Sequence, residues 1–157
     1  MTLRLFVDTN VLIYSRDEAS VFHEIVSEAL HGLVNGGVEL CIHNQVLREY
    51  VAVATRPRPR GLGAGLEQVL NELKEFEGFY KVLPDPGGVW ELWKQNIKDS
   101  GITGLQVHDA FLAAVMKGHK VDTILTLNVK DFESIDGIEV VLPQEWRSLM
   151  PDDNESE

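Results

Sequence analysis

The sequence predicts an α/β fold in which a central parallel sheet is flanked by helices. Short apolar runs that are typical of buried strands alternate along the chain with amphipathic segments of helical periodicity. Strands interleaved with helices indicate a parallel sheet with helices on both faces. The 157 residues suffice for one core, and they leave no room for a second domain. Five strands are expected, near residues 3–7, 38–43, 80–83, 122–127 and 138–142.

The first strand and the first helix meet at a short polar stretch. In "LFVDTNVLIYS", residues 5–15, an apolar strand runs into Asp8, Thr9 and Asn10, and a buried helix follows. One such side chain explains a helix N-cap, because Asp, Thr and Asn accept hydrogen bonds from free N–H groups. Three in a row also fit a ligand site, since sites in open α/β sheets form beyond the carboxyl ends of strands. Both interpretations stay open at this point.

Helices are predicted in the intervals between the strands. The core-facing residues of the helix over 21–37 are Ile25, Val26, Ala29, Leu30 and Leu33, and those of the helix over 66–79 are Leu66, Val69, Leu70, Leu73 and Phe76. The helix over 44–55 stops before Pro57. Further helices are expected over 87–101 and 105–118, with a turn or two after Pro143.

The composition is that of a globular protein with an acidic balance. The net charge is −11, and the last residues, "PDDNESE", carry four acids, so we expect a domain over residues 1–150 and a disordered tail over 151–157. The acidity argues against general electrostatic binding of nucleic acid, but not against a nuclease whose carboxylates are neutralised by cations. The single cysteine, Cys41, and the lack of a signal peptide or membrane span favour a cytoplasmic protein.

Glu49 is a charged residue in an otherwise apolar helix. It lies in "VLREYVAVA", on a face that it shares with Gln45. A carboxylate that points inward is costly unless something positive meets it. A metal ion is one such partner, and an ion pair with Arg48 or Arg56 is the alternative.

Asp109 repeats this pattern in "VHDAFLAAVM", where it shares a partly apolar face with Leu112, Ala113 and Met116. Because it stands in the first turn, attraction to the helix dipole also explains it. The neighbouring His108 lies about 100° around the helix, and we interpret it as a capping or partly buried residue.

Asp131 follows the strand over 122–127 in "TLNVKDF", where turn chemistry alone explains an acid. Thr126 and Asn128 lie at the same carboxyl end of this strand. Asp8 and Asp131 thus follow strands, while Glu49 and Asp109 lie in the first turns of helices that begin beside the same carboxyl edge of the sheet. The four acids therefore converge where this architecture builds its sites.

Four segments resemble the PIN-domain nucleases, and most closely their VapC-type toxins. They are "FVDTNVLIYS", "QVLREYVAVATRP", "VHDAFLAAVMKG" and "ILTLNVKDF", in the order of the family and over nearly the whole chain. The resemblance implies a PIN domain over residues 1–150 with strand order 3-2-1-4-5. It also implies Mg²⁺- or Mn²⁺-dependent endoribonuclease activity, an RNA substrate, a VapB-type antitoxin as partner, and a homodimer.

Site residues are carried over by position. Asp8, Glu49 and Asp109 match the three most regular acids of the family. Many relatives place the fourth acid where this chain has Asn128, and others have Asn there and Asp three residues later, as with Asp131. Contact of Asp131 with a metal, directly or through water, therefore stays open.

Three further residues match supporting positions of the family. Thr9 and Asn10 match its polar pair after the first Asp, and Thr126 matches a hydroxyl near the metal. Oxygen ligands suit Mg²⁺ and Mn²⁺. A bound cation can activate water and stabilise charge on a phosphate, and whether one or two ions bind is left open.

Two other functions fit the same residues less well. In a phosphatase of the haloacid-dehalogenase type, Asp8 would be a covalent nucleophile, but a second acid is expected where Asn10 stands, and Lys120 and Lys130 lack context. A non-catalytic PIN-like module that binds RNA or protein is the second alternative.

The segment "TRPRPRG", residues 55–61, is the densest positive cluster of the chain. Arg56, Arg58 and Arg60 alternate with two prolines, which favour extended geometry and would splay the guanidinium groups apart. They are candidates for holding RNA phosphates beside the metal site, because the Arg fork suits phosphate oxygens. A solvated surface loop is the alternative.

A dimer interface is predicted from apolar residues. The helix around Leu66–Phe76, with Trp90 and Trp93 nearby, offers an apolar patch for a homodimer. The alternative is that these residues complete the core.

Overall fold

The computed structural model describes residues 2–151, which contain one five-stranded sheet. The strands are β1 (Arg4–Val7), β2 (Glu39–Ile42), β3 (Lys81–Val82), β4 (Thr123–Leu125) and β5 (Glu139–Val141). All are parallel, and their order β3-β2-β1-β4-β5 confirms the predicted sheet and strand order. β1 is therefore central and pairs with β4. The N–H of Asp8 continues this pairing by donating to the carbonyl of Leu125 at 3.1 Å.

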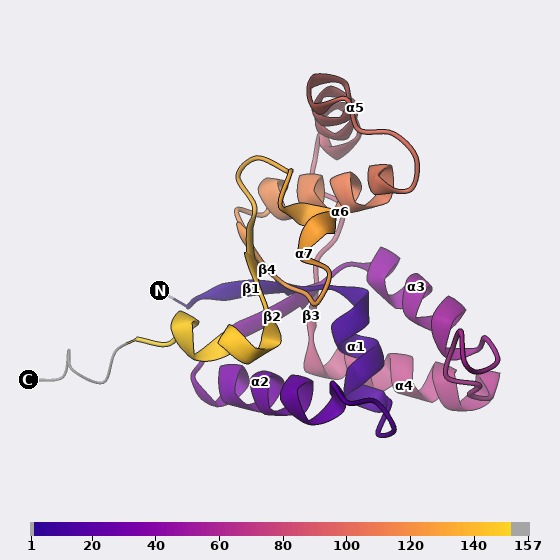
Figure 1. Cartoon of the computed structure of the whole chain (residues 1–157). Helices are drawn as coiled ribbons and strands as arrows, with labels where there is room; N and C mark the ends of the chain where they lie inside the picture. The colour runs from indigo at the N-terminus through magenta and orange to yellow at the C-terminus, as the bar shows by residue number, and fades with distance from the viewer. Residues whose placement is uncertain (1, 152–157) are drawn as a thin grey trace, which may run out of the picture.

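Helices cover both faces of the sheet. They are α1 (Thr9–Arg16), α2 (His23–Asn35), α3 (Asn44–Ala54), α4 (Leu66–Phe79), α5 (Val89–Ser100), α6 (Gln106–Gly118), α7 (Val129–Phe132) and the 3₁₀ helix η1 (Pro143–Leu149). In Figure 1, α2, α4 and η1 lie below the sheet, and α5 and α6 lie above it. The sequence does not predict α7, because four residues are too few to show a helical period.

The core fixes the elements that carry the polar stretch and Asp109. Leu5, Phe6 and Val7 of β1 are fully buried, as expected for a strand covered on both faces. In α6, the residues from Leu112 to Met116 are buried without a break, so this half of the helix is enclosed on all sides. The first turn of α6, with Asp109, is therefore held at a defined position beside the sheet.

Some predicted core positions are wrong. Ile25 in α2 and Leu66 and Leu70 in α4 are exposed. Periodicity identifies the apolar side of a helix, but not how much of that side its neighbours cover. The expected proximity of Trp90 and Trp93 to α4 is also wrong, because α5 packs on α6 and lies at the opposite end of the molecule from α4 (Figure 1).

The predicted acidic tail lies outside the described residues, apart from the exposed Pro151. Among residues 2–151, no helix combines the length and the apolar character that crossing a membrane requires.

Candidate active site

A cavity of about 300 Å³ lies beyond the carboxyl ends of β1 and β4. It is formed by residues of α1, α3, α6 and the segment after β4, which are far apart in the chain. The predicted site residues that line it are Asp8, Thr9, Asn10, Glu49, Arg56, Asp109, Asn128 and Asp131. Thr126 lies behind them and is fully buried. The structure therefore brings the four predicted acids to one place.

Asp8 is held in a fixed orientation. Its side chain is buried, and Oδ1 accepts a hydrogen bond from the N–H of Thr9 at 2.8 Å. Oδ2 accepts from Thr126 Oγ1 at 2.8 Å and from Asn10 Nδ2 at 3.2 Å. Asp8 is also the N-cap residue of α1. Asp8 therefore serves both as the N-cap of α1 and as a lining residue of the cavity.

Thr126 organises the polar groups around Asp8. Besides donating to Asp8, its hydroxyl accepts hydrogen bonds from Asn10 Nδ2 and from the N–H of Asn128, each at 3.0 Å. Its one donor and two acceptor positions are therefore all used. Asn10 Oδ1 in turn accepts from the N–H of Leu127 at 3.1 Å. These bonds tie the start of α1 to the segment that follows β4.

Glu49 reaches the cavity from α3. Its Oε2 accepts from Thr9 Oγ1 at 2.7 Å, and its Oε1 accepts from Gln45 Nε2 at 2.9 Å. Gln45 Nε2 also donates to the carbonyl of His108 at 3.2 Å. One amide group therefore connects Glu49 to the first turn of α6.

Asp109 and Asp131 are less restrained. Asp109 lies in the first turn of α6, and Asp131 lies in α7 where we expected a turn. Within residues 2–151, no hydrogen bond or ion pair holds either carboxylate. His108 is exposed, and Leu105 is the N-cap residue of α6, so the expected capping or burial of His108 is wrong.

Burial and repulsion between the acids raise two pKa values. Burial raises the pKa of Asp8 to about 6, although the hydrogen bonds from Thr126 and Thr9 lower it, and the neighbouring acids add to the rise. Burial also raises the pKa of Asp109 to about 7, and the charges of the other three acids of the cavity contribute. The ionised cavity is therefore under electrostatic strain.

This negative charge is not balanced by ion pairs. Within residues 2–151, none of the four carboxylates pairs with Lys, Arg or His, so the alternative of an ion pair between Glu49 and Arg48 or Arg56 is wrong. Of the described residues that line the cavity, only Arg56 is basic. A cation would therefore relieve the repulsion.

The donor set suits a hard divalent cation. The described lining residues offer carboxylate, amide and hydroxyl oxygens, and no His or Cys is among them. Mg²⁺ and Mn²⁺ prefer such ligands. Within residues 2–151, however, no three His, Cys, Asp or Glu side chains are grouped closely enough to hold a metal ion. An ion bound here would therefore need water molecules to complete its coordination, and Mg²⁺ usually keeps several waters.

The model of the family described as PIN domain matches residues 5–138, which include every acid of the cavity. The chain belongs to the PIN-domain family.

The chain is similar in sequence to a curated protein and in fold to solved structures, in each case over most of both lengths. Ribonuclease VapC48 of Mycobacterium tuberculosis (strain CDC 1551 / Oshkosh) is 24% identical over 135 residues, which are 85% of this chain and 92% of the relative. The structure of VapBC2 from Rickettsia felis bound to a DNA fragment superposes with a TM-score of 0.67 and 17% identity, over 89% of this chain and 98% of the other. DNA-bound VapBC from Salmonella typhimurium gives a TM-score of 0.66 and 20% identity, over 91% and 99%.

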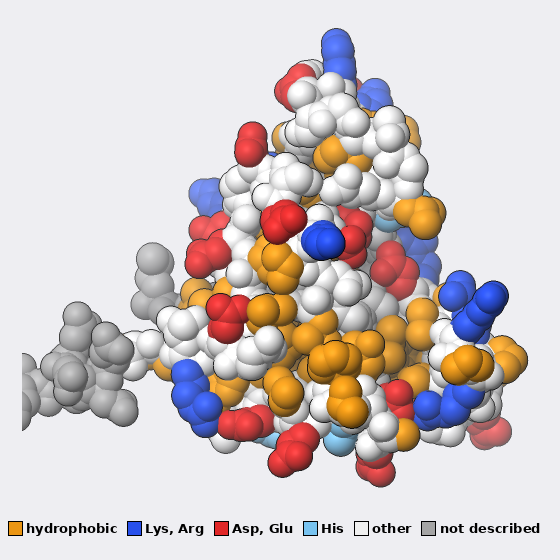
Figure 2. All heavy atoms as spheres, viewed as in Figure 1, with side chains coloured by type: hydrophobic (Ala, Val, Ile, Leu, Met, Phe, Trp, Pro, Cys, Tyr) orange, Lys and Arg blue, Asp and Glu red, His pale blue; other side chains and the backbone are white. Residues whose placement is uncertain are grey.

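The loop after α3 of this PIN domain carries the three predicted arginines. Figure 2 shows Lys and Arg side chains gathered at the right edge, over this loop, while acidic side chains lie between α3 and α6–α7. Arg56 lines the acidic cavity, but Arg58 and Arg60 lie outside it. Arg58 donates to Asp17 at 3.0 Å, so it already has a carboxylate partner.

The expected extended geometry of this loop is wrong. Residues 58–60 form a turn, and the N–H of Gly61 donates to the carbonyl of Pro57 at 3.1 Å. The loop packs closely on α3, because a Cβ at Gly61 would lie 2.2 Å from the carbonyl oxygen of Val53. Local proline stiffness is therefore overridden by packing against the helix.

Gln45 is a site residue that sequence reasoning missed. Its side chain is buried, and it orients Glu49 through the contact described above. A signal was available, because Gln45 stands one turn before Glu49 on the same helix face and a buried amide needs partners. Its contact with the His108 carbonyl depends on how α3 and α6 pack, which the sequence does not reveal.

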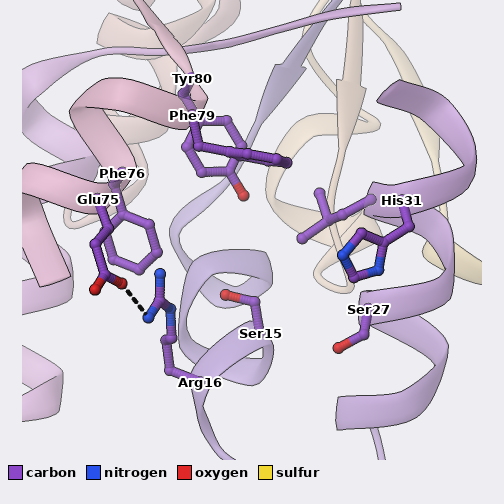
Figure 3. A pocket seen from close by; sticks show the side chains of 9 residues that line it. Ser15, Arg16, Ser27, His31, Glu75, Phe76, Phe79 and Tyr80 are labelled. Carbon is purple, nitrogen blue, oxygen red and sulfur yellow. Dashed lines mark hydrogen bonds and ion pairs between the residues drawn. The ribbon is translucent and has the colours of Figure 1, made fainter. Parts of the chain in front are cut away.

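A second cavity, of about 350 Å³, lies between α1, α2 and α4 (Figure 3). Arg16 donates to Glu75 at 2.5 Å there, and its guanidinium lies over the ring of Phe76. The opposite charges in this cavity are paired with each other, and none of the predicted site residues lines it.

Proposed function

We propose that this PIN domain is a divalent-metal-dependent endoribonuclease and the toxin of a VapBC-type toxin–antitoxin pair. The observation that carries the proposal is the convergence of Asp8, Glu49, Asp109 and Asp131 on one cavity, without ion-pair partners within residues 2–151. The ribonuclease name of the curated relative and the VapBC complexes among the similar structures support it.

The residues take roles that follow from their restraints. When bound, Mg²⁺ or Mn²⁺ would supply activation of water and stabilisation of charge on the phosphate. Asp8 would hold the ion from a fixed position and Asp109 from an adjustable one, and Asp131 and Asn128 would hold it directly or through water. Glu49 is oriented by two hydrogen bonds and keeps lone pairs to orient the attacking water or to hold the ion.

Proton and metal compete for the same carboxylates. In the metal-free protein the raised pKa values of Asp8 and Asp109 keep both acids partly protonated near pH 6. Because carboxylate ligands must be deprotonated, metal binding at this pH releases protons. Metal affinity should therefore increase between pH 6 and pH 8.

The arginines of the loop after α3 contact the RNA backbone. Arg56 lines the cavity itself, and Arg58 and Arg60 lie next to it. Arg forks suit phosphate oxygens, and phosphate contacts position a strand without reading its sequence.

The remaining parts of the proposal concern partners and context. A VapB-type antitoxin binds this toxin, as in the similar VapBC complexes. The protein acts on cytoplasmic RNA as a homodimer, with a PIN domain over residues 1–150.

The alternative is a non-catalytic PIN-like module. One observation favours this alternative: within residues 2–151, no three acids are grouped closely enough to hold a metal ion. An aspartate-nucleophile phosphatase has less support, because Asn10 stands where a second acid is needed and is engaged with Asp8. Of the described residues that line the cavity, none is Lys120 or Lys130.

The test combines cleavage and metal binding. The protein is incubated with structured RNA and Mn²⁺, Mg²⁺ or a chelator, and Mn²⁺ binding is titrated by calorimetry. We expect endonucleolytic cuts that require the ion, together with measurable Mn²⁺ binding. Mn²⁺ binding without cleavage would favour the module, and a silent titration at millimolar Mn²⁺ would contradict the metal site.

A further inference from the structure

The acidic cavity continues into a smaller one, and together they form a groove. This smaller cavity has a volume of about 190 Å³, and Asn10, Ile13 and Val53 line both it and the acidic cavity. Its other lining residues are Tyr14, Asp17, Arg58, Pro59, Arg60, Gly61 and Leu62. The groove therefore runs from the four acids, between α1 and α3, to the basic loop.

The loop wall of the smaller cavity is fixed to α3 by backbone hydrogen bonds. The N–H of Gly63 donates to the carbonyl of Arg56 at 2.8 Å, and the N–H of Ala64 donates to the carbonyl of Ala54 at 2.9 Å. The close packing of Gly61 leaves this wall no room to shift toward the helix. The loop arginines are therefore presented from a backbone that is tied to the helix bearing Glu49.

The side chains of the smaller cavity are suited to a nucleotide. Tyr14 is half-buried and packs on Phe22 with ring centroids 5.1 Å apart, and its remaining surface lines the cavity. Asp17 holds Arg58 at 3.0 Å. Arg60 is exposed and forms no ion pair within residues 2–151. An aromatic surface with an adjacent cation is the combination that binds single-stranded nucleic acid, by stacking and phosphate contact.

We propose that the smaller cavity is a subsite for one unpaired nucleotide next to the scissile phosphate. The base enters against Tyr14, and the backbone phosphate between the two cavities lies toward Arg56 and Arg60. The inference rests on the proposed endoribonuclease function, and it adds where the flanking nucleotide binds. A base in this cavity cannot be paired, so cleavage is directed to loops and single strands.

The test is an abasic scan across the cut site. A short RNA is synthesised with one abasic position, which is moved through the three nucleotides on each side of the cut. Loss of a stacked base costs about tenfold in binding, so we expect kcat/KM to fall about tenfold at one position. In Tyr14→Leu, which keeps apolar contact with Phe22, this penalty should disappear because the stacking partner is already gone.

Arginine variants give a second measurement. Arg60→Gln should weaken RNA binding, and Arg48→Gln is the matched control, since Arg48 is also exposed but lines neither cavity. If Tyr14→Leu fails to fold, the comparison of these two variants decides, and equal RNA affinities would overturn the subsite. An abasic penalty that is the same in wild type and Tyr14→Leu, or no sensitive position, would overturn it as well.

Failure of the proposed function is distinguishable from failure of the subsite. If no RNA is cut, the endoribonuclease proposal fails, and the scan is repeated as binding of fluorescent single-stranded RNA. One sensitive position that depends on Tyr14 would then retain the subsite. Binding that ignores the abasic position, or no binding, would remove it.

Discussion

Replacement of Asp109 by Asn is expected to stabilise the metal-free protein at pH 8. Burial, together with the charges of the neighbouring acids, raises the pKa of Asp109 to about 7 from 3.8, so its ionised form is unfavourable in the folded state. Within residues 2–151 no hydrogen bond or ion pair holds this carboxylate. The substitution therefore removes a destabilising charge and sacrifices no contact.

The magnitude follows from the pKa difference. The rise in the pKa of Asp109 from 3.8 to about 7 would correspond to about 4 kcal/mol of unfolding free energy if the site were fully shielded from solvent. Because Asp109 is only partly buried, solvent screening reduces this, and we expect about 1–2 kcal/mol. In a domain of this length, that is a rise in Tm of roughly 3–6 °C.

The pH dependence has a defined sign. Between about pH 4 and pH 7 the folded protein retains the Asp109 proton that the unfolded chain has lost. The unfolded state binds fewer protons, so the contribution of Asp109 to stability falls as pH rises through this interval. The advantage of Asn should therefore shrink as pH is lowered from 8 toward 4.

Thermal melts in chelator at pH 5, 6.5 and 8 measure both effects. Asp136→Asn is the matched control, because Asp136 is an exposed carboxylate that does not line the cavity. A Tm of Asp109→Asn at pH 8 that is lower than that of wild type, or no higher than that of the control, would refute the repulsion argument.

Three further predictions concern metal, RNA and assembly. Mn²⁺ should raise the Tm of wild type more than that of Asp109→Asn, since the ion binds the folded site; an unchanged wild-type Tm would count against a cation site. Joint replacement of Arg58 and Arg60 by Gln, in an Asp8→Asn background, should weaken RNA binding for all sequences. Anisotropy at several salt concentrations should show that the dependence of log affinity on log salt concentration becomes shallower by about 1–2. An unchanged slope would mean that the loop does not contact RNA. Light scattering at tens of micromolar should give a dimer, and a species of only 17.6 kDa would exclude it.

The parallel sheet could be predicted because its signals are local. β1 is an apolar run buried on both faces, and its alternation with helical segments admits few architectures. The strand order came from the family resemblance, since periodicity does not say which strands are neighbours. The exposed Ile25, Leu66 and Leu70 mark the limit of helical periodicity, because coverage of an apolar face depends on tertiary packing.

The place of the acids was predictable for a similar reason. Asp8 and Asp131 follow strands whose carboxyl ends share one edge of the sheet, and the elements of Glu49 and Asp109 begin beside it. The contacts that orient them were not predictable. The link from Gln45 to the first turn of α6 depends on the distance between two helices, and that distance is set by the whole core.

Proline pattern was a poor guide to the arginine loop. Extended geometry is the local preference of "RPRPR", but the contact of Gly61 with α3 and the pairing of Arg58 with Asp17 fold the segment into a turn. Both contacts involve residues outside the pattern. Proline stiffness predicts the geometry of a loop only where no neighbouring element contacts the loop.

The most direct test of the central claim is the RNA cleavage rate of Asp8→Asn with saturating Mn²⁺, beside wild type. Asn is also a good N-cap and has nearly the shape of Asp, so α1 and the fold should be retained while the central charge is lost. Circular dichroism and Tm verify that the two proteins are equally folded. We predict that nearly all cleavage is lost in Asp8→Asn, and cleavage at the wild-type rate by an equally folded Asp8→Asn protein would contradict the account.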